Sequence, residues 1–367
     1  MNASTQTSMT SMQRTLTTLG HREPDRVPLF LLTTLHGAKE LDLSIQDYFS
    51  HSENVIQGQL RLHKKYRSDC LYPFFYASIE TEAWGGDTIY LPDGPPLCGA
   101  PVIRKAEDID SLVSPRVLES ASLNRVLQTI SALKANVGET VPIIGVAISP
   151  FSLPVMQMGF HAYIELLYEQ PLRFQRLMEL NEAFTVSWAN AQLAAGATAI
   201  CYFDPVSSPT NIPREMYLRT GQQVAKRTIA QIKGPTATHM ASGRGLPILL
   251  DIAETGTAAV GVSALEDLAE LKRAAQQRVS LLGNLNGIEM RRWTPEQAEY
   301  EVKRAIAKAG RGGGFILADN HGEIPWQVPQ EVLMAISAAV DRWGRYPLTW
   351  IEDWIEDWID DTPTLHL

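Results

Sequence analysis

"AAGATAICYFDP" (residues 194–205) carries the pattern on which the fold prediction rests. Gly196 stands where a helix would end, because glycine readily takes the left-handed conformation of a C-cap. The following run, residues 199–205, is almost continuously apolar until it reaches Asp204. Such a run is typical of a parallel strand that is covered on both faces. The stretch therefore predicts a helix, a buried strand and a polar residue at the strand's carboxyl end.

The same pattern recurs along the chain. Eight apolar runs are predicted as strands: 27–33, 70–75, 142–149, 199–205, 235–242, 258–264, 279–286 and 315–320. Helical stretches separate them, and the clearest begins at Thr294, an N-cap residue followed by Pro295. Eight such units favour an α/β fold of the (β/α)8 TIM-barrel type. A doubly wound sheet is the alternative, but no glycine-rich phosphate loop follows the first strand.

The predicted organisation is one domain with two tails. Residues 1–13 are polar and predict a flexible N-terminal tail, residues 14–348 form a single barrel domain, and residues 349–367 form a C-terminal tail. The segment 88–103 looks like an inserted hairpin. The acidic, tryptophan-rich repeat "WIEDWIEDWIDD" (350–361) predicts an amphipathic helix that docks on the barrel or on a partner subunit.

Composition narrows the class of protein. The formal net charge is −9 and no stripe of lysine and arginine is present, so neither nucleic acid nor a membrane surface is an expected partner. No run approaches the roughly 20 apolar residues of a transmembrane helix. The three cysteines are widely spaced, which predicts a reduced, cytoplasmic protein. Homodimerisation stays open.

In a barrel of this type the active site lies at the carboxyl ends of the strands. The candidate side chains there are Asp204, His239, Asn284, Asn286, Asp319, Asn320, His321 and Glu323, with Tyr76 beyond the second strand. Each could instead cap a helix or close a turn. Asn284 and Asn286 are two residues apart in a strand, so both could face one ligand, or one could cap the next helix.

Several blocks of this sequence resemble the uroporphyrinogen decarboxylase superfamily, which includes methyltransferases that exchange methyl groups with corrinoid proteins. The blocks are "REPDRVPLF" (22–30), "SIETEAWGGD" (78–87), "DPVSSPTNIPREMY" (204–217), "GPTATHMASG" (234–243), "LLGNLNG" (281–287) and "ADNHGEIPWQVPQEV" (318–332). They cover nearly the whole barrel in the order that the family shows. The resemblance implies a (β/α)8 barrel and an enzyme.

The decarboxylase branch of that family would carry an R-Q-A-G-R stretch after the first strand and an aspartate after the second. Here the first position reads "LFLLTTLHGAKE" (29–40), and Tyr76 stands near the position of the aspartate. A substrate with many carboxylates would leave its charges unpaired without those arginines. The resemblance therefore makes decarboxylation of a tetrapyrrole the alternative.

The corrinoid-dependent, thiol-methylating branch is more similar, and there a His-x-Cys pair and a later cysteine bind zinc. In this chain His239 is kept, Ala241 replaces the first cysteine, and His321 or Gly322 stands in place of the second. A site that has lost its thiolates is a poor zinc site for thiol activation. We therefore expect no zinc, although a zinc-dependent methylcobalamin:thiol methyltransferase stays open as a further alternative.

Within this relationship tetrahydrofolate is the natural methyl acceptor or donor, because its pterin ring suits a pocket of acids and amides. The resemblance then implies methyl transfer between cobalamin on a partner corrinoid protein and tetrahydrofolate. We expect His239, Asn320, His321 and Glu323 to be catalytic. Asp204, Asn284, Asn286, Asp319 and Tyr76 are the expected substrate-binding residues.

Overall fold

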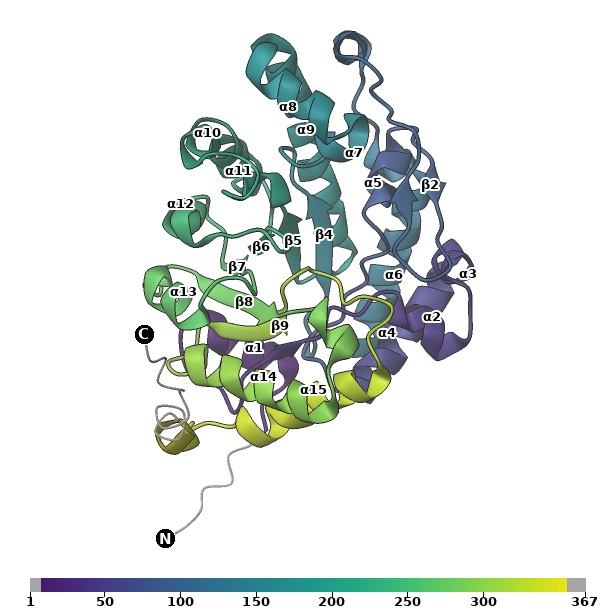
Figure 1. Ribbon diagram of the computed structural model, residues 1–367. Helices are drawn as coiled ribbons and strands as arrows, with labels where there is room; N and C mark the ends of the chain where they lie inside the picture. The colour runs from purple at the N-terminus through teal and green to yellow at the C-terminus, as the bar shows by residue number, and fades with distance from the viewer. Residues whose placement is uncertain (1–7, 355–367) are drawn as a thin grey trace.

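A parallel sheet curls around the centre of the molecule. The computed structural model describes residues 8–354, and Figure 1 shows helices packed around this sheet. Its seven strands follow the order β1-β9-β8-β7-β6-β5-β4. Their bounds are β1 Leu29–Phe30, β4 Ile144–Ile148, β5 Ala199–Phe203, β6 Thr236–His239, β7 Ala259–Gly261, β8 Ser280–Leu285 and β9 Phe315–Asp319. All pairs between neighbours are parallel. The predicted α/β, TIM-barrel-like class is confirmed at this level.

The predicted strand at 70–75 is wrong as a strand. Only Leu71 pairs in parallel, through an isolated bridge with Ile143. Two residues before Leu71, the N–H of Asp69 donates to the carbonyl of Leu29 on β1 at 2.6 Å. The segment thus lies between β1 and β4, where an eighth strand would lie. Pro73 has no N–H to donate, so a ladder cannot continue past it.

Helices fill the connections between strands. They are α1 Ser11–Leu19, α2 His36–Leu41, α3 Ile45–Ser50, α4 Ser52–Tyr66, α5 Ser78–Ala83, α6 Ala121–Val137, α7 Pro154–Met158, α8 Phe160–Glu169, α9 Pro171–Ala195, α10 Arg214–Arg219, α11 Gly221–Ile229, α12 Leu249–Ala253, α13 Leu268–Ala275, α14 Pro295–Ala309 and α15 Gln330–Trp343. The predicted hairpin is present as β2 Thr88–Ile89 paired antiparallel with β3 Leu97–Cys98. The cap at Thr294 is also confirmed, since its side chain accepts from the N–H of Gln297.

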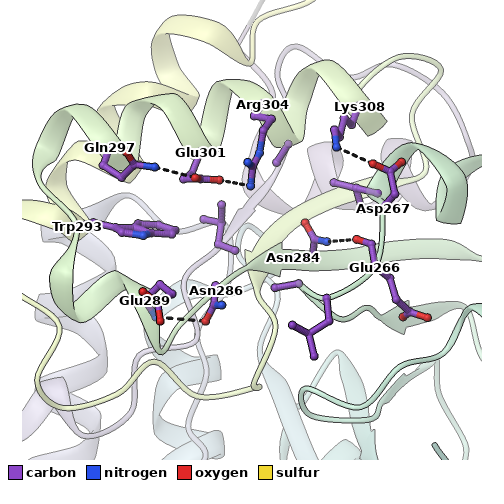
Figure 2. A pocket seen from close by; sticks show the side chains of 15 residues that line it. Glu266, Asp267, Asn284, Asn286, Glu289, Trp293, Gln297, Glu301, Arg304 and Lys308 are labelled. Atoms are coloured by element: carbon purple, nitrogen blue, oxygen red, sulfur yellow. Dashed lines mark hydrogen bonds and ion pairs between the residues drawn. The ribbon is translucent and has the colours of Figure 1, made fainter. Parts of the chain in front are cut away.

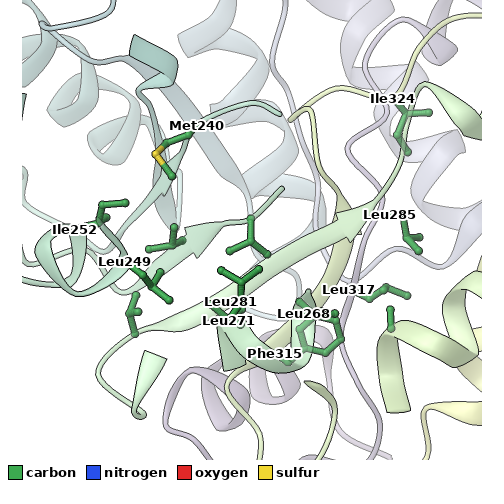
Figure 3. Packing of buried hydrophobic residues seen from close by; sticks show 14 of the residues in the cluster. Met240, Leu249, Ile252, Leu268, Leu271, Leu281, Leu285, Phe315, Leu317 and Ile324 are labelled. Atoms are coloured by element: carbon green, nitrogen blue, oxygen red, sulfur yellow. The ribbon is translucent and has the colours of Figure 1, made fainter. Parts of the chain in front are cut away.

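Apolar side chains pack on both faces of the sheet. Leu281 of β8 and Phe315 of β9 contribute to the outer layer, where Leu271 and other residues of the surrounding helices contact them (Figure 3). The neighbouring residues Leu282 and Ile316 belong instead to the inner cluster, which also contains Tyr72. Strand residues of alternate parity therefore face opposite layers, as the pleat of a strand requires. Both faces are buried, which explains why the strands read as continuous apolar runs.

Helix α1 closes the amino-terminal end of the barrel. It begins at Ser11, inside the segment 1–13 that the sequence assigns to a tail. Arg14 of this helix pairs with Asp25 at 2.7 Å and with Asp69 at 2.5 Å, and Asp69 also accepts from Arg26 at 2.7 Å. These ion pairs are largely buried. They attach α1 to the start of β1 and to the bridging segment at Leu71.

The chain beyond α15 packs back onto the barrel. Residues 350–354 are helical. The rings of Trp343, Trp350 and Trp354 contact one another in sequence, and the ammonium of Lys303 on α14 lies 4.1 Å from the ring centre of Trp343. The rest of the predicted tryptophan repeat lies outside the described residues. Between residues 8 and 354 no helix is long and apolar enough to cross a membrane.

Candidate active site

Five of the predicted site residues gather at the carboxyl end of the barrel. His239 ends β6, Asp319 ends β9, and Asn320, His321 and Glu323 follow β9 directly. We call these five residues the mouth cluster. Parallel strands bring their carboxyl ends to one edge, which is why residues 80 positions apart in sequence can meet here. The electrostatic effect of His321 on the pKa of His239 reflects this proximity.

His239 is fully buried, and its protonation can be assigned from its contacts. Its Nδ1 accepts the N–H of Ala241 at 3.0 Å, so the ring proton resides on Nε2. Nε2 itself has no hydrogen-bond partner among residues 8–354. The ring stacks on Phe203, with centroids 5.6 Å apart. Burial, followed by the nearby His321, lowers the pKa of His239 to about 4, so this imidazole is neutral at pH 7.

Asp319 holds the chain that follows β9. Its Oδ2 accepts the N–H groups of His321 at 2.8 Å and of Gly322 at 3.0 Å. Its Oδ1 is buried and has no hydrogen-bond partner in the described part of the chain. Burial raises the pKa of Asp319 to about 6, although the backbone hydrogen bonds oppose that rise.

Asn320 fixes the tautomer of His321. Its Oδ1 accepts the N–H of Gly287 at 3.3 Å and also lies 2.7 Å from Nδ1 of His321. Because that oxygen is an acceptor, Nδ1 of His321 donates to it, and Nε2 of His321 is an unprotonated acceptor. Burial lowers the pKa of His321. The two histidines are therefore complementary, since His239 offers a proton on Nε2 and His321 offers a lone pair on Nε2.

Glu323 is the second acid of the mouth cluster. Its Oε1 accepts from the hydroxyl of Thr34, which follows β1. Burial, together with the nearby charge of Asp319, raises the pKa of Glu323 to about 7, although the hydrogen bond from Thr34 opposes that rise. Both acids are bonded by hydroxyl or backbone N–H donors, and no lysine or arginine of the described chain donates to either. A buried carboxyl without a cation binds its proton more tightly than a carboxyl in water does.

Asp204 lies beside the mouth cluster, but both of its carboxylate oxygens already accept hydrogen bonds. Its carboxylate accepts from the hydroxyls of Ser149 at 2.6 Å, Ser152 at 2.7 Å and Ser207 at 2.5 Å. Its backbone N–H donates to the carbonyl of His239 at 2.7 Å. The side chain therefore ties together the loops that follow β4 and β5. Burial raises the pKa of Asp204 against the opposing effect of the three hydroxyls.

Asn284 and Asn286 line a different hollow. A pocket of about 570 Å³ lies between α14 and the loops that follow β7 and β8, and Trp293 and Arg304 are among the residues that line it (Figure 2). Asn286 caps the next turn, because its Oδ1 accepts the N–H groups of residues 288 and 289. Asn284 donates to the carbonyl of Ser263 at 2.9 Å. The structure thus shows the predicted cap at Asn286, and both amides line the same pocket.

Tyr76 lies apart from the mouth cluster. Its hydroxyl donates to Glu82 at 2.9 Å and accepts from Tyr90 of the inserted hairpin at 3.1 Å. Its ring packs against Phe49. The structure therefore places Tyr76 between the hairpin and the helical layer.

Three partners were not singled out by sequence reasoning. Ser152 and Ser207 complete the shell of Asp204, and Gly261 makes room for the ring of His239. The serines flank predicted strand ends and could have been found as capping residues. No sequence signal identifies Gly261, because its role depends on the neighbouring strand.

The donor set does not fit a zinc ion bound through thiolates. Ala241 has no ligand atom in its side chain, and neither His321 nor Gly322 supplies the thiolate of the second cysteine position. Across residues 8–354, no group of three or more His, Cys, Asp or Glu side chains is arranged to hold a metal ion. The three cysteines are free, and Cys70 and Cys201 are buried in the inner cluster.

Comparison with known proteins supports the fold and gives the family. A methyltransferase from Methanosarcina mazei has a similar structure, with a TM-score of 0.83 at 21% identity over 91% of this chain and 99% of that one. A uroporphyrinogen decarboxylase of Methylococcus capsulatus is 27% identical over 86% of this chain and 94% of its own length. One of Coxiella burnetii is 28% identical over 88% and 92%. The family model described as uroporphyrinogen decarboxylase (URO-D) matches residues 10–343. This chain belongs to the uroporphyrinogen decarboxylase family.

Proposed function

We propose that this chain is a methyltransferase that moves a methyl group between a corrinoid, carried by a partner protein, and tetrahydrofolate, without zinc. The observation that carries the proposal is the polarity of the mouth cluster. Two acids, two neutral histidines and an amide make up this cluster, and hydroxyl and backbone N–H groups are the donors to the two acids. Such a set suits an uncharged, nitrogen-rich ring better than a polyanion.

Decarboxylation of a tetrapyrrole is the second candidate, and the names of the curated relatives favour it. Its substrate carries many carboxylates, which would enter beside Asp319 and Glu323. Like charges at short range repel one another, and no guanidinium contacts either acid to offset the repulsion. The stretch after β1 reads "LHGAKE" (35–40), without arginine. We therefore rank decarboxylation below methyl transfer.

Transfer to tetrahydrofolate makes two demands on the protein. In the proposed transfer, N5 of tetrahydrofolate bonds to the methyl carbon as the bond between cobalt and that carbon breaks. The two electrons of the broken bond would stay on cobalt. The reacting atoms must therefore be held in line, and such orientation supplies several kcal/mol of a barrier. N5 must also lose its proton. Nε2 of His321 is an unprotonated acceptor at the site and is the group that we assign to take it.

Spectroscopy under anaerobic conditions tests the proposal. The purified chain is mixed with methylcobalamin and tetrahydrofolate in the presence of a zinc chelator, and conversion of the corrinoid is followed by its visible spectrum. We expect conversion with tetrahydrofolate and none when a thiol such as 2-mercaptoethanol replaces it. Incubation with uroporphyrinogen is run in parallel. Formation of a decarboxylated porphyrinogen without corrinoid conversion would favour the second candidate instead.

A further inference from the structure

Two polar atoms of the mouth cluster are buried and unpaired. They are Nε2 of His239, whose side chain is 0% exposed, and Oδ1 of Asp319, which is also 0% exposed. Buried polar atoms in folded proteins are nearly always hydrogen-bonded. In each residue the other polar atom is bonded to backbone N–H groups, so the side chain is held in place with one atom free. Groups held in this way are free to pair with a ligand.

The two unpaired atoms can each be assigned as a hydrogen-bond donor or acceptor. Nε2 of His239 carries the ring proton and is a donor, because Nδ1 accepts from Ala241. Oδ1 of Asp319 is an acceptor when the carboxyl is ionised. Glu323 adds a further acceptor, since only its Oε1 makes a hydrogen bond within the described residues. The mouth thus offers two carboxylate acceptors and one imidazole donor.

We infer that these three groups bind the 2-amino-4-oxopyrimidine edge of the pterin, an inference that rests on the proposed function. The 2-amino group and N3–H are neighbouring donors that match the carboxylates of Asp319 and Glu323. The adjacent C4 carbonyl is an acceptor that matches Nε2–H of His239. This assignment leaves the saturated ring, which carries N5, for His321. In this assignment the residues that bind the pterin edge are different from His321, the base that takes the proton of N5.

Backbone packs closely against the ring of His239 on two sides. A Cβ on Gly322 would lie 3.0 Å from Phe203 and 3.3 Å from Cε1 of His239, and a Cβ on Gly261 of β7 would lie 2.8 Å from Nε2 of His239. Neither unpaired atom is in contact with solvent. Binding therefore requires the residues packed around these atoms to open a path to them. The ligand then supplies hydrogen bonds that the covered state lacks.

A pair of ligands that differ at one edge tests the inference on the unmodified protein. 6-Methyltetrahydropterin carries the 2-amino donor, whereas 6-methyltetrahydrolumazine carries a carbonyl acceptor at that position. Binding of each is measured by anaerobic calorimetry at pH 7.5, where Asp319 is ionised. We expect the pterin to bind at least tenfold more tightly. Equal affinities for the two ligands would overturn the inference.

Asp319→Asn gives a second, independent arm. The amide oxygen should stay with the N–H groups of residues 321 and 322, which places the NH2 group where Oδ1 was. An acceptor becomes a donor, so we expect the preference to reverse toward the lumazine. Glu80→Gln is the matched control, because Glu80 is a buried acid outside the mouth that accepts the N–H of Ile148. Its preference should remain that of the unmodified chain.

The outcomes separate this inference from the proposed function. Methyl transfer to tetrahydrofolate by the unmodified chain, together with equal affinity for the two ligands, would leave the function standing and overturn the edge assignment. Failure both to transfer methyl and to bind either ligand would overturn both. If Asp319→Asn does not fold, the affinity ratio of the unmodified chain decides alone. An Asp319→Asn variant that folds and keeps the pterin preference would also contradict the inference.

Discussion

Asp319 and Glu323 are held at the barrel mouth by hydroxyl and backbone N–H donors instead of cations. Each acid therefore binds its proton more tightly in the folded chain than in water. The pKa values of about 6 and about 7 place both titrations near neutral pH. A small change in pH or a bound ligand can thus change the charge of this site.

Glu323→Gln should change how stability depends on pH. The folded chain binds the Glu323 proton more tightly than the unfolded chain, so stability falls as pH rises from about 4.5 to about 7. Gln removes this loss. Urea unfolding at pH 4.5 and pH 8 should show the variant gaining about 1–3 kcal/mol on the unmodified chain at the higher pH. A stability difference that does not vary with pH would contradict the assigned pKa.

Gly261→Ala should displace His239. A Cβ at this position would lie 2.3 Å from Cδ2 of the His239 ring, which packs against Phe203 and cannot retreat freely. Overpacking of this kind costs about 1–3 kcal/mol. Gly94→Ala is the control, because the nearest atom to its Cβ is Cδ1 of Leu91 at 3.7 Å. Urea unfolding of both variants measures the difference, and equal stabilities would contradict the packing described here.

At the residue scale the sequence predicted which side chains reach the mouth but not their partners. His239, Asp319, Asn320, His321 and Glu323 follow strand ends, and strand ends can be recognised from apolar runs. The bonded state of an acid depends on residues from other strands. Asp204 illustrates this limit, because two of its three serine partners follow β4, more than 50 residues away in sequence.

At the scale of elements, the start of helix α1 could not be predicted, because the polar composition of residues 1–13 indicates a tail. Arg14 of helix α1 forms ion pairs with Asp25 and Asp69, and these pairs could not be predicted from residues 1–13 alone. Asp69 lies at the centre of that network and is 1% exposed. By contrast, α14 was predictable because its cap and its apolar face are both local features. Local signals were sufficient where the element's contacts are local.

Asp69→Ala should strongly destabilise the fold. The change leaves the guanidinium groups of Arg14 and Arg26 largely buried without the carboxylate that both contact. Removing one partner of a buried pair costs about 3–5 kcal/mol. Glu119→Ala, which removes an exposed pair with Arg116, should cost less than about 1 kcal/mol. Denaturant unfolding compares the two variants, and similar losses would show that the network does not anchor α1.

The whole molecule is a curled parallel sheet with its helices outside and its polar residues at one end. The order of strands and helices predicted this arrangement, because continuous apolar runs require cover on both faces. The failure at 70–75 shows the limit of that reasoning. Pro73 limits pairing there, yet Leu71 still bridges to Ile143. The core also extends past the predicted boundary at residue 348, because the side chain of Ile351 is buried in it.

Truncation tests where the folded unit ends. A chain that stops at Pro347 loses Leu348 and Ile351, which are 4% and 1% exposed. Burial of two aliphatic side chains contributes about 3–5 kcal/mol. A chain that stops at Trp354 keeps both side chains and the contact between Trp350 and Trp343. Thermal unfolding should show a clear loss for the shorter chain only, and equal melting temperatures would place the boundary before residue 348.

We propose that this barrel moves a methyl group between a corrinoid and N5 of tetrahydrofolate. The most direct test is to supply methylcobalamin with an isotope-labelled methyl group, in the presence of both tetrahydrofolate and a competing thiol, and to identify the labelled product by NMR. We expect label on N5 of tetrahydrofolate and none on sulfur. Label on the thiol alone, or no transfer of label by a chain that decarboxylates uroporphyrinogen, would contradict it.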